Sequence, residues 1–294
     1  MQCPFQILVV VKNQQILAGL ILTKDGRGNF ANPYLCKYLG VYYASFVGTP
    51  YNQETKRRKV TNLLLTEITQ KPTFNYFFHP RFTTYFSFYL KNYESRLRYS
   101  YWINLQDQPL AQITANFHSK LRSEIKIAQA QSFSIVNDVS VNVFTQICQK
   151  TFLQKGHKFP FTIPFLNNYC QQLLDRKALQ LNGIKDEKGR VMAVVGILIT
   201  PQTNTLILSG FDKQLIQRGA NEYLVYHCIQ QAKKQADFFD FEGSMIPVIE
   251  AFYRKFGGEF RPYLNIYKNS TRQFLSEKLR FWYRRLRASL TFMN

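Results

Sequence analysis

The chain has 294 residues, of which 46% are apolar and 16% aromatic. This is enough to bury one large core or two of ordinary size, and it excludes a disordered chain. The formal charge of +20 favours anionic partners, whether nucleic acid, a phosphate-bearing cofactor or acidic lipid, without choosing among them.

The cysteines and apolar runs indicate a cytoplasmic protein. Five scattered cysteines without a CxxC pair favour reduced thiols over a disulfide framework, and we expect no metal site. No apolar run approaches the about 18 residues of a membrane span. No basic segment precedes the first apolar run, so we expect no signal peptide.

The first part of the chain predicts alternating strands and helices. Apolar residues 6–12 and 16–23 flank a polar turn, which indicates a β-hairpin that we expect to be buried on both faces. Further strands are expected at 74–78 and 97–104, and helices at 54–70, 84–91 and 109–131. This alternation is typical of an α/β domain.

Four cations gather in the first turns of helix 54–70, where they oppose the helix dipole. They either form a solvated face or meet an anion.

The second part predicts an antiparallel meander with helices before and after it. A strand at 132–136 and helices at 141–155 and 167–177 come first, with a basic loop that contains His157 between the helices. Strands at 178–185, 190–200 and 205–211 follow, joined by segments with the turn chemistry of hairpins. A helix is then expected over 217–235.

A strand that carries two carboxylates follows that helix. In the segment 237–244, Phe239 and Phe241 fall on one face of the strand, while Asp240 and Glu242 fall on the other. This places the carboxylates at the strand end where open α/β sheets hold ligands. The alternative is that both residues only cap the next helix and hold a turn. That helix starts near Pro247 and is ended by two glycines, 257–258.

These segments resemble a known family. The sequence FDFEGS followed by IEAFYRKFGGEFRPY resembles the C-terminal signature of FemAB-like acyltransferases, a branch of the GNAT superfamily. RYSYWINL and residues 122–128 are similar to the strand and helix that precede it. The resemblance implies an α/β (α+β) fold of two tandem GNAT-like domains, 1–131 and 132–268, each a mixed, largely antiparallel sheet flanked by helices. Family members have a helix ahead of the first hairpin, so we expect the first domain to lack it.

The resemblance also implies an activity. It predicts an N-acyltransferase that moves an acyl or aminoacyl group from acyl-CoA or aminoacyl-tRNA, as co-substrate, to an amine acceptor such as a cell-wall precursor. No permanently bound cofactor is expected. We take Asp240, Glu242 and Tyr253 as candidate catalytic residues, Tyr253 standing where the family has a lysine.

Two sets of binding residues follow from the same resemblance. The turn Arg218, Gly219, Ala220 and Asn221 corresponds to a degenerate form of the family's pyrophosphate-binding turn at a helix N-terminus. Alternatively, Gly219 merely permits close packing. We take His157, Arg122 and Lys255 as candidate substrate contacts.

The end of the chain, residues 269–294, predicts a basic amphipathic helix. Its apolar positions are Leu275, Leu279, Trp282 and Leu286, surrounded by five basic residues: Lys278, Arg280, Arg284, Arg285 and Arg287. Such a helix binds the inner face of an anionic membrane or a phosphate backbone, or packs on the protein body. The alternative function is therefore a non-catalytic basic module that binds nucleic acid or anionic membrane on a degenerate GNAT fold.

Overall fold

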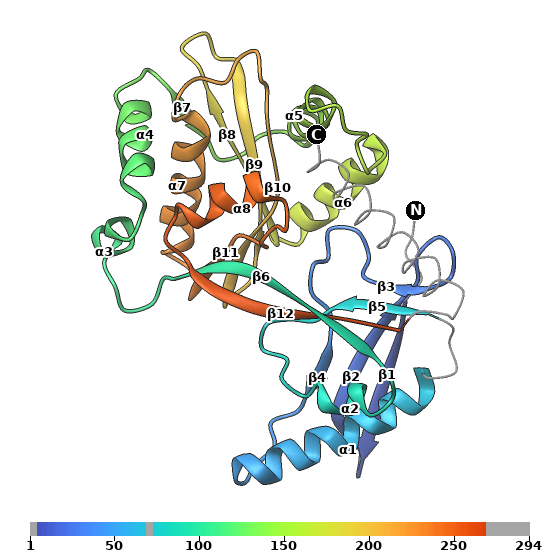
Figure 1. Ribbon diagram of the computed structural model, residues 1–294. Helices are drawn as coiled ribbons and strands as arrows, with labels where there is room; N and C mark the ends of the chain where they lie inside the picture. The colour runs from blue at the N-terminus through green and yellow to red at the C-terminus, as the bar shows by residue number, and fades with distance from the viewer. Residues whose placement is uncertain (1–4, 69–72, 269–294) are drawn as a thin grey trace, which may run out of the picture. The chain divides into compact units, whose positions relative to one another are not determined.

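The computed structural model describes residues 5–68 and 73–268 (Figure 1). Its contacts divide the chain into two compact units. Of the described residues, one unit contains those up to 98 together with 262–268, and the other contains residues 99–261. Two strands, β6 (Glu94–Asn104) and β12 (Glu259–Lys268), start in one unit and end in the other. The C-terminal segment 269–294, for which we expect a basic helix, lies outside the described residues.

The first unit opens with the expected hairpin. Strands β1 (Phe5–Lys12) and β2 (Gln15–Thr23) pair antiparallel, and β4 (Val41–Tyr43) joins the other side of β2. The expectation of burial on both faces is wrong for β1. It is the terminal strand of this sheet, and its outward side chains Phe5, Ile7, Val9 and Val11 are 48–67% exposed.

A core of aromatic and aliphatic side chains holds the first unit together. Strand β5 (Phe74–Phe77) lies between β3 (Phe30–Ala31) and the end of β12. Helix α1 (Pro50–Ile68) buries Val60, Leu64, Leu65 and Ile68 in the same core, and the short helix α2 (Phe86–Tyr89) buries Phe88 there.

The second unit contains the expected antiparallel meander. Strands β8 (Leu179–Lys185), β9 (Val191–Ile199) and β10 (Thr203–Phe211) pair in sequence, and β7 (Ser134–Val136) adds to β8. Strand β11 (Phe238–Asp240) pairs parallel with β10 and antiparallel with β6. The strand order is β6-β11-β10-β9-β8-β7.

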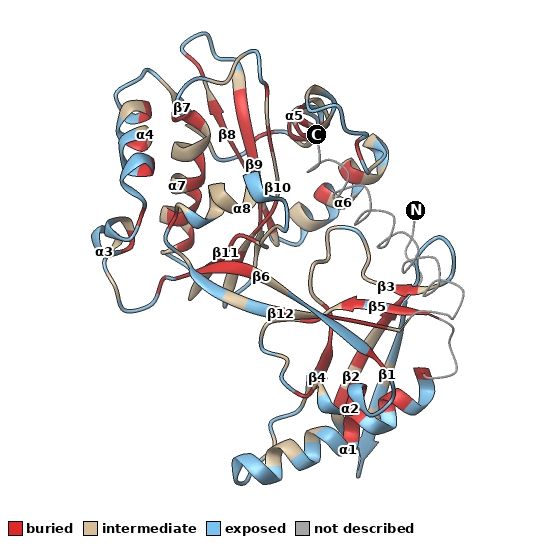
Figure 2. Ribbon diagram, viewed as in Figure 1, coloured by how far each residue is buried: buried red, intermediate tan, exposed pale blue. Residues whose placement is uncertain are grey.

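Helices cover both faces of this sheet (Figure 1). Helices α4 (Ser119–Gln129) and α7 (Ala220–Ala232) lie on one face, and α5 (Val141–Gln154) and α6 (Ile163–Asp175) lie on the other. Figure 2 shows the buried residues concentrated on β9 and on the sides of the helices that face the sheet. Helix α8 (Pro247–Arg254) follows β11.

The helix expected over 109–131 is broken in two. Helix α3 (Leu110–Ala115) ends before Phe117, which is buried, and α4 begins after His118, whose ring nitrogen accepts a hydrogen bond from the Lys120 amide at 3.2 Å. The break turns the chain so that Phe117 enters the core. Apolar periodicity alone does not reveal it.

The compact units differ from the division expected near residue 131. Residues 99–131 group with the second unit because β6 pairs with β11 and α4 packs against α7. Where two GNAT-like domains meet along the sequence stays a prediction. Among the helices in the described ranges, none is long and apolar enough to cross a lipid bilayer.

The contact between α4 and α7 depends on Gly219. This residue caps α7 with a left-handed φ of 76°. A Cβ atom there would lie 2.2 Å from the carbonyl oxygen of Glu124 and 3.1 Å from Cβ of Ala128. The backbones of the two elements therefore approach as closely as they can, and no side chain fits between them.

We predict that Gly219→Ala destabilises the protein more than Gly189→Ala. Gly189 has nearly the same φ, 75°, but its Cβ would meet open space. In both variants the left-handed alanine lowers the free energy of unfolding by about 1 kcal/mol. Only Gly219→Ala lowers it by roughly 1–3 kcal/mol more, through overpacking. Urea unfolding of both variants measures the difference. Equal losses of unfolding free energy would contradict the close packing.

Candidate active site

The candidate site lies where β10 and β11 stop pairing. Their parallel register ends at the pair Thr205 and Asp240. Strand β10 continues to Phe211 with β9 as its partner, while β11 ends. Beyond this point, within the described residues, one edge of β10 is no longer paired with β11. The end of β11 therefore adjoins backbone groups that the sheet itself does not use.

Asp240 is fully buried and holds the turn that follows the strand. Its Oδ1 accepts hydrogen bonds from the Ser100 hydroxyl and, at 2.7 Å, from the Glu242 amide. A buried carboxylate requires such donors. This geometry favours the alternative in which Asp240 holds a turn. It does so by binding the backbone amide of Glu242.

Glu242 and Gly243 form a strained turn against β6. Both have left-handed φ values, 59° and 65°, which is unusual for a glutamate. A Cβ at Gly243 would lie 2.1 Å from the carbonyl oxygen of Tyr99, so only glycine fits there. The turn leaves Glu242 half-buried. Strain of this kind occurs at functional sites.

Tyr253 joins these carboxylates from α8. Its ring packs on Phe241 with centroids 5.0 Å apart. Burial raises the pKa of the Tyr253 phenol, and the nearby charges of Glu242 and Asp240 raise it further. The phenol is therefore protonated at neutral pH. The structure thus brings together the three residues that the sequence nominated for catalysis.

A second polar pair lies near them that the sequence reasoning missed. The hydroxyl of Tyr101 donates to Oε1 of Glu250 at 2.7 Å, and Nε of Arg254 donates to the same oxygen at 2.9 Å. Burial, together with Glu250, raises the pKa of Tyr101 to about 12. The hydrogen bond from Tyr101 is the main cause that lowers the pKa of Glu250. The spacing of Glu250 and Arg254 on one helix face was the available signal.

The turn before α7 has its arginine already engaged. Arg218 donates to both carboxylate oxygens of Glu124, at 2.9 and 3.0 Å. Gly219 packs against α4, in agreement with the alternative that this glycine permits close packing. The amide of Ala220 donates to the carbonyl of Gln217 at 3.1 Å. The amides of Arg218, Gly219 and Asn221 meet no acceptor among the described residues. The turn retains amides for an anion at a positive helix end.

Of the three candidate substrate contacts, Arg122 and Lys255 lie near each other at the start of α4, where the His118 amide donates to the Lys255 carbonyl at 2.8 Å, and His157 lies on a separate loop. Arg122 donates to the carbonyls of Ala115, at 3.0 Å, and Phe117, and so stabilises the end of α3. Lys255 caps α8, and its charge contributes to lowering the pKa of Glu124, after the larger contribution of Arg218. Lys255 therefore lies near the turn before α7. His157 is exposed in the loop after α5.

A cavity of about 360 Å³ lies at the C-terminal end of β6. Its polar lining residues are Trp102, Asn104, Gln106, Asp107, Gln108, Asn116 and Glu259. None of the residues nominated from the sequence lines it. It nevertheless adjoins them, because its lining residue Trp102 pairs with Asp240 across β6 and β11.

We predict that Tyr101→Phe destabilises the protein at pH 7 by about 2 kcal/mol, the value of a hydrogen bond to a charged group. The lowered pKa of Glu250 means that its stabilisation is present above the unfolded pKa of about 4.3 and is lost as the pH falls through the folded value. The loss should therefore shrink at pH 3. Urea unfolding at both pH values measures it.

Tyr99→Phe is the matched control for this prediction. The Tyr99 ring packs on Phe260 at 4.8 Å, and its hydroxyl makes no hydrogen bond within the described residues. Its removal should change stability little at either pH. If Tyr101→Phe loses the same unfolding free energy at pH 7 and at pH 3, the hydrogen bond to an ionised Glu250 is contradicted.

Comparison with known structures supports the fold. A crystal structure of FemX matches with a TM-score of 0.66 and 10% identity, covering 89% of this chain and 88% of that one. The C-terminal domain of a putative lysylphosphatidylglycerol synthetase from Agrobacterium fabrum matches with a TM-score of 0.58 and 11% identity, covering 89% and 84%. A tandem GNAT protein from the clavulanic acid biosynthesis pathway matches with a TM-score of 0.54 and 8% identity, covering 90% and 82%.

Comparison by sequence locates the domain. No curated protein matches the chain. Residues 119–244 match the model of the acetyltransferase (GNAT) domain. This range contains α4, the meander, the turn before α7, Asp240 at the end of β11 and Glu242 in the turn after it. The expected resemblance is confirmed: residues 119–244 match a GNAT domain model, and the chain has a fold similar to that of the tandem GNAT proteins.

Proposed function

We propose that the protein is an N-acyltransferase that uses acyl-CoA or aminoacyl-tRNA as donor. The observation that carries this proposal is the position of Glu242 and Tyr253, half-buried at the point where β10 and β11 stop pairing. An amine acceptor must lose a proton, and the donor carbonyl must be polarised. A carboxylate and a protonated phenol are suited to these two tasks.

The reaction assigns one role to each of these residues. The acceptor nitrogen attacks the donor carbonyl carbon, and Glu242 takes the proton that the nitrogen loses. The Tyr253 hydroxyl donates a hydrogen bond to the carbonyl oxygen as charge develops there, the bond from carbon to the leaving thiol or ribose oxygen then breaks, and the proton held by Glu242 passes to the leaving group. Asp240 holds the backbone of Glu242 through its amide. The free amides before α7 contact the phosphates of the donor.

The neighbours in fold suggest the acceptor class. One of them is a putative lysylphosphatidylglycerol synthetase, whose name specifies an aminoacylated membrane lipid. We therefore propose an amine-bearing cell-envelope precursor as acceptor, met at the inner face of the membrane. The charge of +20 is consistent with an anionic donor.

We predict that Glu242→Gln and Tyr253→Phe each lower kcat/KM for acyl transfer by about 100-fold or more, the usual contribution of a general acid or base. Titration calorimetry with acetyl-CoA and with charged tRNA identifies the donor first. Glu187→Gln, at an exposed carboxylate of the β8–β9 turn, is the control and should keep full activity. Binding of neither donor would remove the proposal.

A second candidate is a non-catalytic basic module. The engaged Arg218 and the buried Asp240 favour it, because both are used structurally. It predicts that Glu242→Gln leaves the biological activity intact. Neutralising Arg280, Arg284, Arg285 and Arg287, which lie outside the described residues, should then abolish binding to tRNA or to anionic vesicles. The acyltransferase proposal predicts the reverse order of effects.

A further inference from the structure

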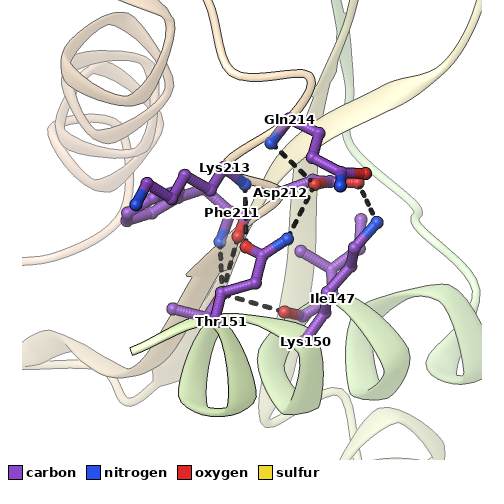
Figure 3. Close-up of polar contacts among 8 residues, drawn as sticks. Ile147, Lys150, Thr151, Phe211, Asp212, Lys213 and Gln214 are labelled. Carbon is purple, nitrogen blue, oxygen red and sulfur yellow. Dashed lines mark hydrogen bonds and ion pairs between the residues drawn. The ribbon is translucent and has the colours of Figure 1, made fainter. Parts of the chain in front are cut away.

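The last turns of α5 are attached to the end of β10 by a polar cluster that the proposed chemistry does not use (Figure 3). The hydroxyl of Thr151 accepts a hydrogen bond from the Phe211 amide at 2.7 Å and lies 2.9 Å from the carbonyl oxygens of Ile147 and Phe211. A Cβ at Gly210 would lie 2.8 Å from Cα of Cys148. Helix and strand are therefore in direct backbone contact here.

Asp212 is the centre of this cluster. It is buried, and its Oδ2 accepts from Nζ of Lys150 at 2.5 Å. Its Oδ1 accepts from Nε2 of Gln154 at 3.1 Å and from the Gln214 amide at 3.0 Å. The oxygen of the Gln154 side chain accepts from the Lys213 amide at 2.8 Å. Two side chains of α5 thus bind the first residues of the turn that leads to α7 (Figure 3).

These contacts are stronger than those of an exposed ion pair. The Asp212 side chain is 7% exposed and Lys150 is 43% exposed, so the carboxylate lies largely out of water. Burial raises the pKa of the Asp212 carboxyl, but the donors from Lys150, Gln214 and Gln154 outweigh this effect and lower it. Removing one donor leaves a buried charge under-compensated.

Two loops start from this cluster. After Gln214 the chain continues into the turn that contains Arg218 and Gly219, where the proposal places the donor. After Gln154 it continues into the loop that contains His157. Lys155, the first residue of that loop, lies with Nζ 5.2 Å from the centre of the Phe211 ring. Both loops are therefore anchored to the same few side chains.

We propose that Lys150, Gln154 and Asp212 are positioning residues that couple the donor turn, residues 213–219, to the α5–α6 loop, residues 155–162. Occupancy of the donor turn is transmitted through Asp212 to α5 and orders the loop. The anchoring of both loops follows from the contacts above, whereas the binding of a donor at residues 213–219 rests on the proposed function.

Hydrogen exchange measured by mass spectrometry on the full chain without ligand tests the anchor. In Lys150→Met and Asp212→Asn, exchange should rise about tenfold or more in both loops, as expected for loss of a charged hydrogen bond. Peptides of β9 should stay unchanged, which shows that the fold is intact, and Lys150→Arg should restore protection. Lys188→Met, at an exposed turn, is the control. Loosening of only one loop would overturn the proposal.

Addition of coenzyme A tests the transmission. In the wild type, exchange should slow in both segments; in Lys150→Met, it should slow in residues 213–219 alone. Protection of 155–162 that persists in Lys150→Met overturns the coupling. If coenzyme A protects neither segment of the wild type, coenzyme A is not the donor and the proposed function fails for it, while the ligand-free measurement still decides the anchor.

Discussion

The buried carboxylate of Asp240 is the constraint on which the geometry of the site depends. A charge removed from water is stable only where donors surround it. The Ser100 hydroxyl supplies one from β6, and the Glu242 amide supplies another from the chain that follows. The second contact closes the turn in which Glu242 and Gly243 have left-handed φ values and Gly243 lies against β6. The backbone of the half-buried Glu242 is therefore held by the fully buried Asp240.

Glycine has a related role on two faces of the second unit. Gly219 allows α7 to start directly against α4, and Gly210 allows β10 to lie directly on α5. Both contacts fix the ends of the same connection, residues 211–219. The backbone of this connection is thus defined before any ligand binds. Rigid elements of this kind hold a binding turn more precisely than a free loop does.

Local pattern was sufficient for much of the fold. The meander could be predicted because its strands alternate with turn-forming residues, and α8 could be predicted because Pro247 and Gly257 bound it. The juxtaposition of Glu242 and Tyr253 followed from a motif. Long-range contacts were not accessible. Arg218 pairs with Glu124, and Tyr101 pairs with Glu250, across more than 90 positions of the sequence. The buried Asp240 likewise depends on Ser100, 140 positions earlier. The break between α3 and α4 could not be predicted, because Phe117 fits the apolar spacing of one continuous helix and is equally buried when the helix is broken.

The discontinuity of the first unit has a consequence for synthesis on the ribosome. Strand β5 has β3 on one side, and its other partner is the end of β12, where the Asn265 amide reaches Asn75 and the carbonyl of Tyr76. Residues 99–261 are continuous and can fold as soon as they emerge, whereas the first unit must wait for residue 268. At 5–20 residues per second the delay is roughly 10–30 s. During that time Phe74 and Tyr76, which are buried in the finished protein, belong to an unfinished sheet. The nascent chain is then a natural client for chaperones.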